Sequence, residues 1–307
     1  MTEITASLVK ELREKTGAGM MDCKAALGES AGNMDDAVDW LRTKGLAKAA
    51  KKAGRVASEG LIGIAISEKA GAMIELNSET DFVSRNEDFQ KMVAEITTLS
   101  LKAGGNLEKT LKTTISEGKN IEEYITEMVG TIGENMTLRR VVSLSVEEGL
   151  VISYIHGQMA PNLGKIGVLV ALSSKGDKEK LAALGKQLAM HIAATAPQAL
   201  SQESLDKDVI ERERAVLIAE AKDSGRPDNI IEKMVEGRLN KFFQEVVLLA
   251  QSFVIDGETP IVNVLEKASE ELGEKVEISG FSRFQLGEGI EKAEDDFASE
   301  VAAIAKS

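Results

Sequence analysis

Side chains that form disulfides, bind metals or act as nucleophiles are scarce in this chain. Its 307 residues include one cysteine, Cys23, and two histidines, His156 and His191. A lone cysteine cannot form an intrachain disulfide, which is typical of a reducing compartment. The histidines and the cysteine give no metal-ligand spacing, and none of them is arranged with a serine or an acid as a nucleophile would require. We therefore expect no metal site and no covalent catalysis.

Long apolar runs and an excess of positive charge are absent as well. No run approaches the roughly 20 apolar residues of a membrane helix, and the N-terminus lacks the basic-then-apolar order of a secretory signal. We therefore expect a cytoplasmic protein without membrane contact. The formal net charge is −13; residues 1–55 carry ten Lys or Arg against eight Asp or Glu, so the remainder carries −15. An acidic body argues against direct nucleic-acid binding, because phosphates must be neutralised by cations.

The sequence also lacks a phosphate-binding loop. The glycines at 17 and 19 do not match GxxxxGK[ST], since Lys24 follows Cys23 and not a glycine. Gly287-Glu288-Gly289 has no third glycine and so does not complete GxGxxG. We therefore expect no nucleotide or other cofactor bound by this chain itself.

Three short helical patterns occupy the first 55 residues. Thr5 is suited to cap the first helix, the second begins at Met20-Met21, and Asn33 is suited to cap the third. This plan resembles a ubiquitin-associated domain. The basic stretch 44–55 is interpreted as a solvated, partly helical tether. It has no interleaved aromatic residues and does not predict a nucleic-acid site.

The sequence from 56 to 285 predicts an α+β core of two similar halves with antiparallel sheets, 56–144 and 145–285. Each half has a strand hairpin, then a helical pattern, then a further strand. His191 lies on the helix of the second half and is expected to be structural. The predicted strands are 61–66, 71–76 and 138–144 in the first half, and 151–156, 166–172, 252–255 and 276–284 in the second.

An antiparallel helical hairpin is predicted as an insertion at 208–247. A charge-rich helix is followed by a Gly-Arg-Pro-Asp turn and by a second helix with a coiled-coil-like apolar seam. Self-association through this hairpin and contact with a partner are both open. Residues 286–307 form the C-terminal module, whose stretch 289–305 has apolar residues on one helical face. That face must be buried on its own core or on a partner.

The segment Thr80-Asp81-Phe82-Val83 connects a strand to a helix and has two interpretations. In the first, Phe82 tucks under the following helix, and Asp81 or Ser84 caps that helix. In the second, Phe82 is an exposed aromatic wedge beside a carboxylate, offered to a partner. Composition alone favours the first, because most aromatic residues near helix starts belong to the core.

Two motifs resemble the elongation factor Ts family, and the resemblance extends over essentially the whole chain. They are Leu-Val-Lys-Glu-Leu-Arg-Glu-Lys-Thr-Gly-Ala-Gly-Met-Met-Asp-Cys-Lys at 8–24 and Thr-Asp-Phe-Val at 80–83. The resemblance implies a guanine nucleotide exchange factor that binds elongation factor Tu, displaces Mg²⁺ and promotes GDP release. It implies a coiled-coil protrusion at the helical hairpin and a C-terminal module that reaches the GTPase. The loop 157–164 is longer than is usual in the family.

The resemblance also assigns two sets of partner-binding residues. Residues that dislocate Mg²⁺ on the partner are Thr80, Asp81, Phe82 and Val83. Residues that dock on the partner are Arg13, Met20, Met21 and His156. Two other functions compete with exchange. An adaptor would bind its partner without changing nucleotide release, and an enzyme would need a catalytic constellation that the sequence does not contain.

Overall fold

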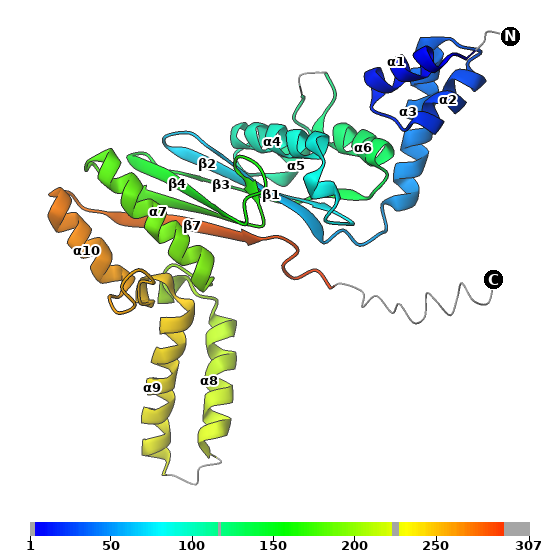
Figure 1. The fold of residues 1–307 in the computed structure, drawn as a ribbon. Coiled ribbons are helices and arrows are strands. Elements are labelled where there is room, and N and C mark those ends of the chain that lie inside the picture. The colour runs from blue at the N-terminus through cyan, green and yellow to red at the C-terminus, as the bar shows by residue number, and fades with distance from the viewer. Residues whose placement is uncertain (1–3, 116–117, 223–226, 292–307) are drawn as a thin grey trace.

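A three-helix module, two stacked β-sheets and a projecting pair of helices make up the fold (Figure 1). The computed structural model describes residues 4–115, 118–222 and 227–291. Within these ranges no helix is both long and apolar enough to cross a membrane. The α+β class, the helical N-terminus and the antiparallel sheets are as predicted. Most of the expected C-terminal helix falls outside the described residues.

The N-terminal module packs three helices around a small apolar core. Thr5 caps the first helix, because its Oγ1 accepts a hydrogen bond from the Leu8 backbone N–H at 3.3 Å. Asn33 caps the third in the same way, with Asp35 and Asp36 as donors. The helices are α1 (Ala6–Thr16), α2 (Met20–Glu29) and α3 (Met34–Lys52). The core consists of Val9, Leu12, Cys23, Ala26, Leu27 and Ala37.

The prediction for residues 44–55 is confirmed in part: the stretch is partly helical, but it is not a solvated tether. Helix α3 continues to Lys52, and its second half packs against α6 (Ile121–Ile132). Two glycines meet where the helices cross: a Cβ on Gly130 would lie 2.8 Å from the Gly45 Cα. Ala49 belongs to the core of the first subdomain. The basic composition drew attention to the charges, whereas the small residues Gly45 and Ala49 are what lets α3 and α6 approach closely.

The first sheet has the strand order β3-β2-β1-β5 and is covered on one face by helices. Phe89, Met92 and Ile96 of helix α4 fill the core between helices and sheet. The strands are β1 (Glu59–Ile66), β2 (Ala70–Ser78), β3 (Met136–Ser145) and β5 (Leu163–Gly164). The helices are α4 (Glu87–Lys102), α5 (Leu107–Leu111) and α6, and a 3-10 turn spans Val83–Arg85.

The second sheet has the order β4-β6-β7 and packs face to face on the first. Ile62, Ile64 and Met73 of the first sheet meet Val151, Leu169 and Ala171 of the second in one apolar cluster. Helix α7 covers the opposite face of the second sheet. The elements are β4 (Gly149–His156), β6 (Ile166–Ser173), β7 (Glu277–Gln285), α7 (Lys178–Thr195) and α10 (Ile261–Leu272).

The two halves share one topology, which confirms the predicted repeat. In each half a hairpin is followed by a helix, and the third strand then pairs beside the second. In each half the third strand also has a bulge, so that Arg139 on β3 and Ser279 on β7 have no partner in the register. The long loop 157–164 has a structural role that the sequence did not reveal. It supplies β5, which pairs with β1 and so extends the edge of the first sheet.

The predicted helical hairpin is present, and it projects from the second subdomain (Figure 1). Helix α8 spans Lys207–Lys222 and α9 spans Asp228–Val246. Half of the predicted turn between them, Gly225 and Arg226, lies outside the described residues. The buried seam consists of Leu217, Ala221, Ile231, Val235, Leu239 and Phe243. Short 3-10 helices at Gln202–Ser204 and Leu248–Ala250 flank the hairpin.

The predicted strand at 252–255 is a turn. The Asp256 carboxylate accepts hydrogen bonds from the Glu258 and Thr259 backbone N–H groups at 3.0 Å, which closes the turn locally. Phe253 is buried, whereas Ile255 is 55% exposed. The donors of the apolar run itself bond within the turn and to α7, because the Phe253 N–H donates to the Thr259 carbonyl at 2.8 Å and the Val254 N–H donates to His191 Nδ1 at 3.3 Å.

His191 is fully buried on α7, as its expected structural role requires. Its Nδ1 accepts a hydrogen bond from the Val254 backbone N–H at 3.3 Å, so its Nε2 donates to Gln251 Oε1 at 2.9 Å. The Gln251 amide is oriented by its own donation to the Glu245 carbonyl at 2.7 Å. The neutral imidazole thus fits its surroundings, and a second ring proton would oppose the Val254 donor.

We predict that His191 makes stability depend on pH on the acid side. Burial lowers the pKa of His191 below its ordinary value of 6.5. Above pH 6.5 the imidazole is neutral in both the folded and the unfolded protein, so the full contribution of His191 to stability is present. As the pH falls toward the lower pKa of the folded protein, the unfolded protein takes up the proton first, and this contribution is lost. The loss is at most about 1.4 kcal/mol per pH unit. Urea unfolding of His191→Gln should show a shallower acid decline than the wild type; parallel declines would contradict the prediction.

Candidate functional site

Phe82 is presented to solvent at the end of a buried strand. The chain leaves β2 at Ser78, and Phe82 is 73% exposed while the next residue, Val83, is buried. The interpretation of Phe82 as a core residue under α4 is therefore wrong. The cap of α4 is also not the expected one: Asn86 Oδ1 accepts from the helix, at 2.8 Å from the Asp88 N–H. Asp81 and Ser84 do not cap α4.

Two carboxylates brace the base of the loop that carries Phe82 between β2 and α4, residues 79–86, which we call the Phe82 loop. Glu134 accepts hydrogen bonds from the Thr80 backbone N–H at 2.9 Å and from Thr80 Oγ1 at 2.7 Å. Reciprocally, Glu79 accepts from the Asn135 N–H at 2.6 Å. These bonds continue the β2–β3 pairing beyond its last backbone pair. Sequence reasoning missed Glu134, because only the register of the two strands brings it to Thr80.

The same brace reaches the end of the N-terminal helices. Arg55, just beyond α3, forms an ion pair with Glu79 at 3.2 Å. The Arg55 carbonyl accepts a hydrogen bond from Asn135 Nδ2 at 2.7 Å. The Phe82 loop, the start of β3 and the exit of α3 are therefore joined by direct polar contacts. A displacement of the N-terminal module would strain the base of the loop.

Asp81 carries an exposed charge next to the Phe82 ring. Its carboxylate lies 3.6 Å from an Arg85 guanidinium, and both side chains are more than half exposed. Such a pair contributes little to stability, since water solvates both charges. The Asp81 carboxylate is therefore accessible to a partner. The backbone beneath it is held by Ser84, whose Oγ donates to the Asp81 carbonyl at 2.5 Å.

Two methionines are exposed at the start of α2. Met20 is 52% exposed and Met21 is 76% exposed, on the module whose core lies beneath them. Arg13 is exposed in the last turn of α1, and its carbonyl accepts the Gly17 N–H that ends that helix. Along the chain, the glycine loop between α1 and α2 lies between Arg13 and the two methionines. Exposed methionine side chains adapt readily to an apolar partner surface.

His156 lies on the second subdomain and not on the Phe82 loop. It is the last residue of β4, is exposed, and has Nδ1 3.3 Å from the Tyr154 hydroxyl. A further exposed apolar surface was missed in the sequence. Val254, Ile255 and Val262 are each at least 40% exposed, around the turn that follows the hairpin. The sequence predicted a strand at 252–255, and it therefore gave no sign that Val254 and Ile255 are exposed.

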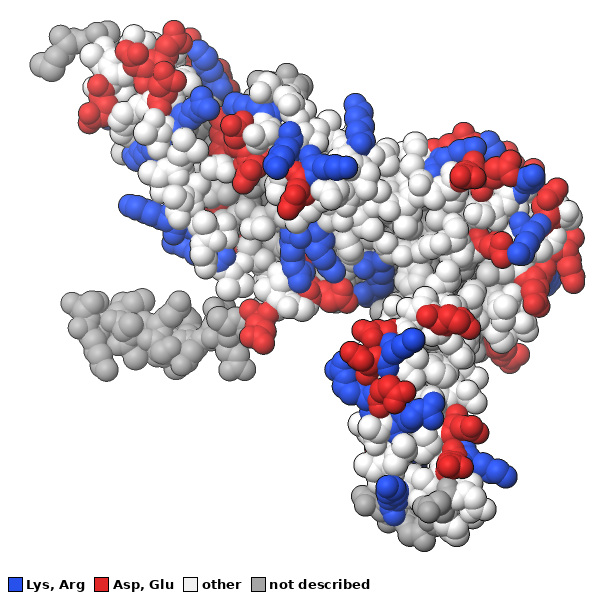
Figure 2. Space-filling view, turned by 180° about the vertical axis from the view of Figure 1, so that it is seen from behind, with Lys and Arg blue, Asp and Glu red and all other residues white. Residues whose placement is uncertain are grey.

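Charged side chains of both signs are interspersed over the surface (Figure 2). On the face drawn, the described parts of the N-terminal module and the hairpin carry no continuous surface of one sign. Among the described residues, no group of three or more His, Cys, Asp or Glu is placed to hold a metal ion. What the geometry offers is an aromatic ring and a carboxylate on a braced loop, with two methionines on a separate module.

These features define a modular α+β protein that presents apolar side chains on a rigid frame, the arrangement of a binding protein. The family model described as elongation factor TS matches residues 79–288. A protein named Elongation factor Ts from Parvibaculum lavamentivorans is 61% identical over the full length of both chains. Another of that name, from Rhodospirillum rubrum, is 59% identical, again over the whole of both chains. The chain belongs to the elongation factor Ts family.

Proposed function

We propose that this protein is a guanine nucleotide exchange factor that binds elongation factor Tu with GDP and promotes GDP release, so that GTP can bind. One observation carries the proposal: Phe82 is 73% exposed on a loop whose base is braced. Burying so large a ring in a partner releases apolar surface from water. An exposed ring held by a rigid base is suited to enter another protein, because little ordering remains to be done on binding.

The proposed mechanism uses shape and charge without covalent chemistry. Phe82 wedges between elements beside the partner's Mg²⁺ site, and Asp81 disturbs the ion's surroundings. Mg²⁺ demands near-ideal octahedral coordination, so a small displacement of its ligands is costly. Without Mg²⁺, the diphosphate charge is left unneutralised, and GDP dissociates. Thr80 and Val83 support this action, since the first anchors the loop to Glu134 and the second is buried beneath it.

Docking through other surfaces holds the wedge at its target. We propose that Arg13, Met20 and Met21 bind the GTPase domain and that His156 contacts the same partner. By reciprocity, a factor that weakens the binding of guanine nucleotide, whether GDP or GTP, is itself bound less tightly when that nucleotide is present. The arriving GTP therefore releases the factor and completes the exchange.

The test is to measure complex formation and GDP release in the same samples. Purified elongation factor Tu is loaded with a fluorescent GDP analogue and titrated with this protein. We expect the release rate to rise with concentration and to saturate. Tight binding with an unchanged release rate would instead support the adaptor function and refute the proposal.

The Glu134 brace predicts a graded loss of exchange. Glu134→Ala removes both acceptors of Thr80 and should lower the accelerated release roughly fivefold, about 1 kcal/mol, because the loop is no longer held. Glu134→Gln keeps one acceptor oxygen and should lose less. Release rates are measured at saturating factor, with circular dichroism to confirm folding. If the alanine variant matches the wild type, the brace has no role in exchange.

A further inference from the structure

A carboxylate in the first turn of α2 reaches across to the long helix α3. We propose that Asp22 is a positioning residue, which holds Met20 and Met21 at a fixed place relative to the Phe82 loop. It does so by bridging α3 where that helix passes from the N-terminal module to the core (Figure 1). The inference rests on the proposed exchange function, in which these methionines dock on the partner.

Helix α3 is shared between two apolar cores. Its first half packs within the module, where Ala37 is buried and Val38 and Leu41 lie beside it. Its second half packs on α6, and Ala49 joins the core of the first subdomain. The stretch of α3 between these two halves therefore sets the direction in which the whole module points.

That stretch of α3 contains a glycine, Gly45, at the crossing with Gly130 of α6. A glycine inside a helix weakens it, because the glycine backbone has more conformational freedom to lose on folding. The two apolar cores hold the helix on either side of this position. We therefore expect α3 to bend most readily at Gly45, and the module to turn with it.

Two lysines flank Gly45 and meet a single carboxylate. Lys44 and Lys48 are four residues apart, so they lie on the same face of α3. Lys44 Nζ lies 3.2 Å from Asp22 Oδ1, and Lys48 Nζ lies 2.8 Å from Asp22 Oδ2. The Asp22 carboxylate thus binds α3 both before and after the glycine. A bend at Gly45 would have to break at least one of these two bonds.

The three charged side chains are partly sheltered from water. Asp22 is 34% exposed and each lysine is 38% exposed, so solvent screens these bonds less than it screens a fully exposed ion pair. The Lys44 ammonium also lies 4.5 Å from the centre of the Trp40 ring, a cation–π contact that orients it. The hydrogen bond from Lys48 lowers the pKa of Asp22, which keeps this carboxylate charged at neutral pH.

The bridge bears on the docking residues because Asp22 directly follows Met20 and Met21. Just beyond the other end of α3, Arg55 forms its ion pair with Glu79 in the Phe82 loop at 3.2 Å. A stiff α3 therefore fixes the separation between the exposed methionines and the Phe82 ring. A partner that meets both surfaces at once binds more tightly when this separation is fixed, because less remains to be ordered on binding.

The experiment compares two ion pairs of the same module in the full-length chain. Asp22→Asn keeps the shape of the side chain and removes the charge that both lysines bind. Asp35→Asn is the matched control, because the Lys15–Asp35 pair, at 3.5 Å, joins α1 to α3 without spanning Gly45. Circular dichroism confirms that each variant is folded.

The first readout is a distance and needs no partner. Spin labels at Glu29 on α2 and Lys91 on α4, both exposed, report the separation of module and core. Every chain also carries Cys23→Ala, so that only these two positions are labelled. We expect a narrow distance distribution with Asp22 intact and in Asp35→Asn, and a broader one in Asp22→Asn. A distribution that Asp22→Asn leaves unchanged would overturn the inference.

The second readout is GDP release from elongation factor Tu as the factor is titrated. Asp22→Asn should raise the half-maximal concentration about fivefold and leave the maximal rate unchanged, because the Phe82 loop itself is intact. In a chain that also carries Met20→Ala and Met21→Ala, Asp22→Asn should cause no further rise. An unchanged half-maximal concentration, or effects that multiply, would overturn the inference. Failure of the wild type to accelerate release would overturn the exchange function, whereas the distances test the bridge by themselves.

Discussion

Replacing Phe82 with alanine should lower the acceleration of GDP release from elongation factor Tu at least tenfold and leave the fold intact. The ring is 73% exposed, so its removal opens no cavity in the core, and the buried Val83 still anchors the chain. If the wedge acts on the partner, losing it removes about 1.4 kcal/mol or more of coupling between factor and nucleotide. Stopped-flow release of a fluorescent GDP analogue at saturating factor measures the effect.

Two matched variants separate the wedge from simple loss of apolar surface. Ile66→Ala removes an apolar side chain that is 51% exposed at the end of β1 and should leave exchange unchanged. Asp81→Ala should lose less than Phe82→Ala, because the wedge acts mainly by shape. Equal release rates for Phe82→Ala and the wild type would refute the wedge.

Gly130→Ala should destabilise the protein, although alanine is a better helix former than glycine. Propensity alone favours alanine by about 1 kcal/mol. At this position, however, a Cβ would lie 2.8 Å from Gly45 Cα, where helices α3 and α6 cross. Overpacking of this kind costs about 1–3 kcal/mol. The net result should be a lower unfolding midpoint and weaker binding of elongation factor Tu, since α3 carries the N-terminal module.

Gly237 supplies the matched control for this prediction. It lies inside helix α9, and no atom is within 4 Å of the position that a Cβ would take. Gly237→Ala should therefore raise the midpoint of urea unfolding, while Gly130→Ala lowers it. If both variants stabilise the protein to the same degree, the helices do not depend on the close contact of the two glycines.

The parts of the fold that the sequence predicted are those with a strong local period. Short apolar runs separated by turn residues identified the hairpins, and the caps Thr5 and Asn33 marked two helix starts. What escaped prediction depends on contacts between distant residues. The strand β5 within the loop 157–164 is only two residues long and is stabilised by pairing with β1. The helical continuation of α3 is stabilised by its packing on α6.

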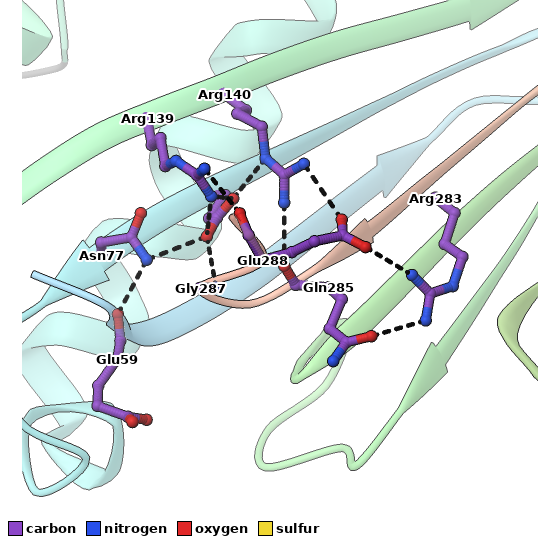
Figure 3. A network of polar contacts seen from close by, with 9 residues as sticks. Glu59, Asn77, Arg139, Arg140, Arg283, Gln285, Gly287 and Glu288 are labelled. Atoms are coloured by element: carbon purple, nitrogen blue, oxygen red, sulfur yellow. Dashed lines mark hydrogen bonds and ion pairs between the residues drawn. The ribbon is translucent and has the colours of Figure 1, made fainter. Parts of the chain in front are cut away.

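The sequence drew attention to the residues of the candidate site but not to the contacts that support them. The motif at 80–83 drew attention to Phe82, but local pattern could not decide between a buried and an exposed ring. The contacts of Glu134 with Thr80 and of Glu75 with two arginines depend on the β2–β3 register, and a single bulge places both Arg139 and Arg140 within reach of Glu75 (Figure 3). In sequence, Arg139 and Arg140 are simply two charges in a strand. Such features require three-dimensional pairing and are invisible to periodicity.

The most direct measurement of the central claim is GDP release from elongation factor Tu at saturating Mg²⁺ and again after Mg²⁺ has been chelated, with and without this protein. If the factor works by displacing Mg²⁺, its acceleration should be large when the ion is present and should shrink toward none when the ion has already gone. The same acceleration factor in both conditions would contradict Mg²⁺ displacement as the means of exchange.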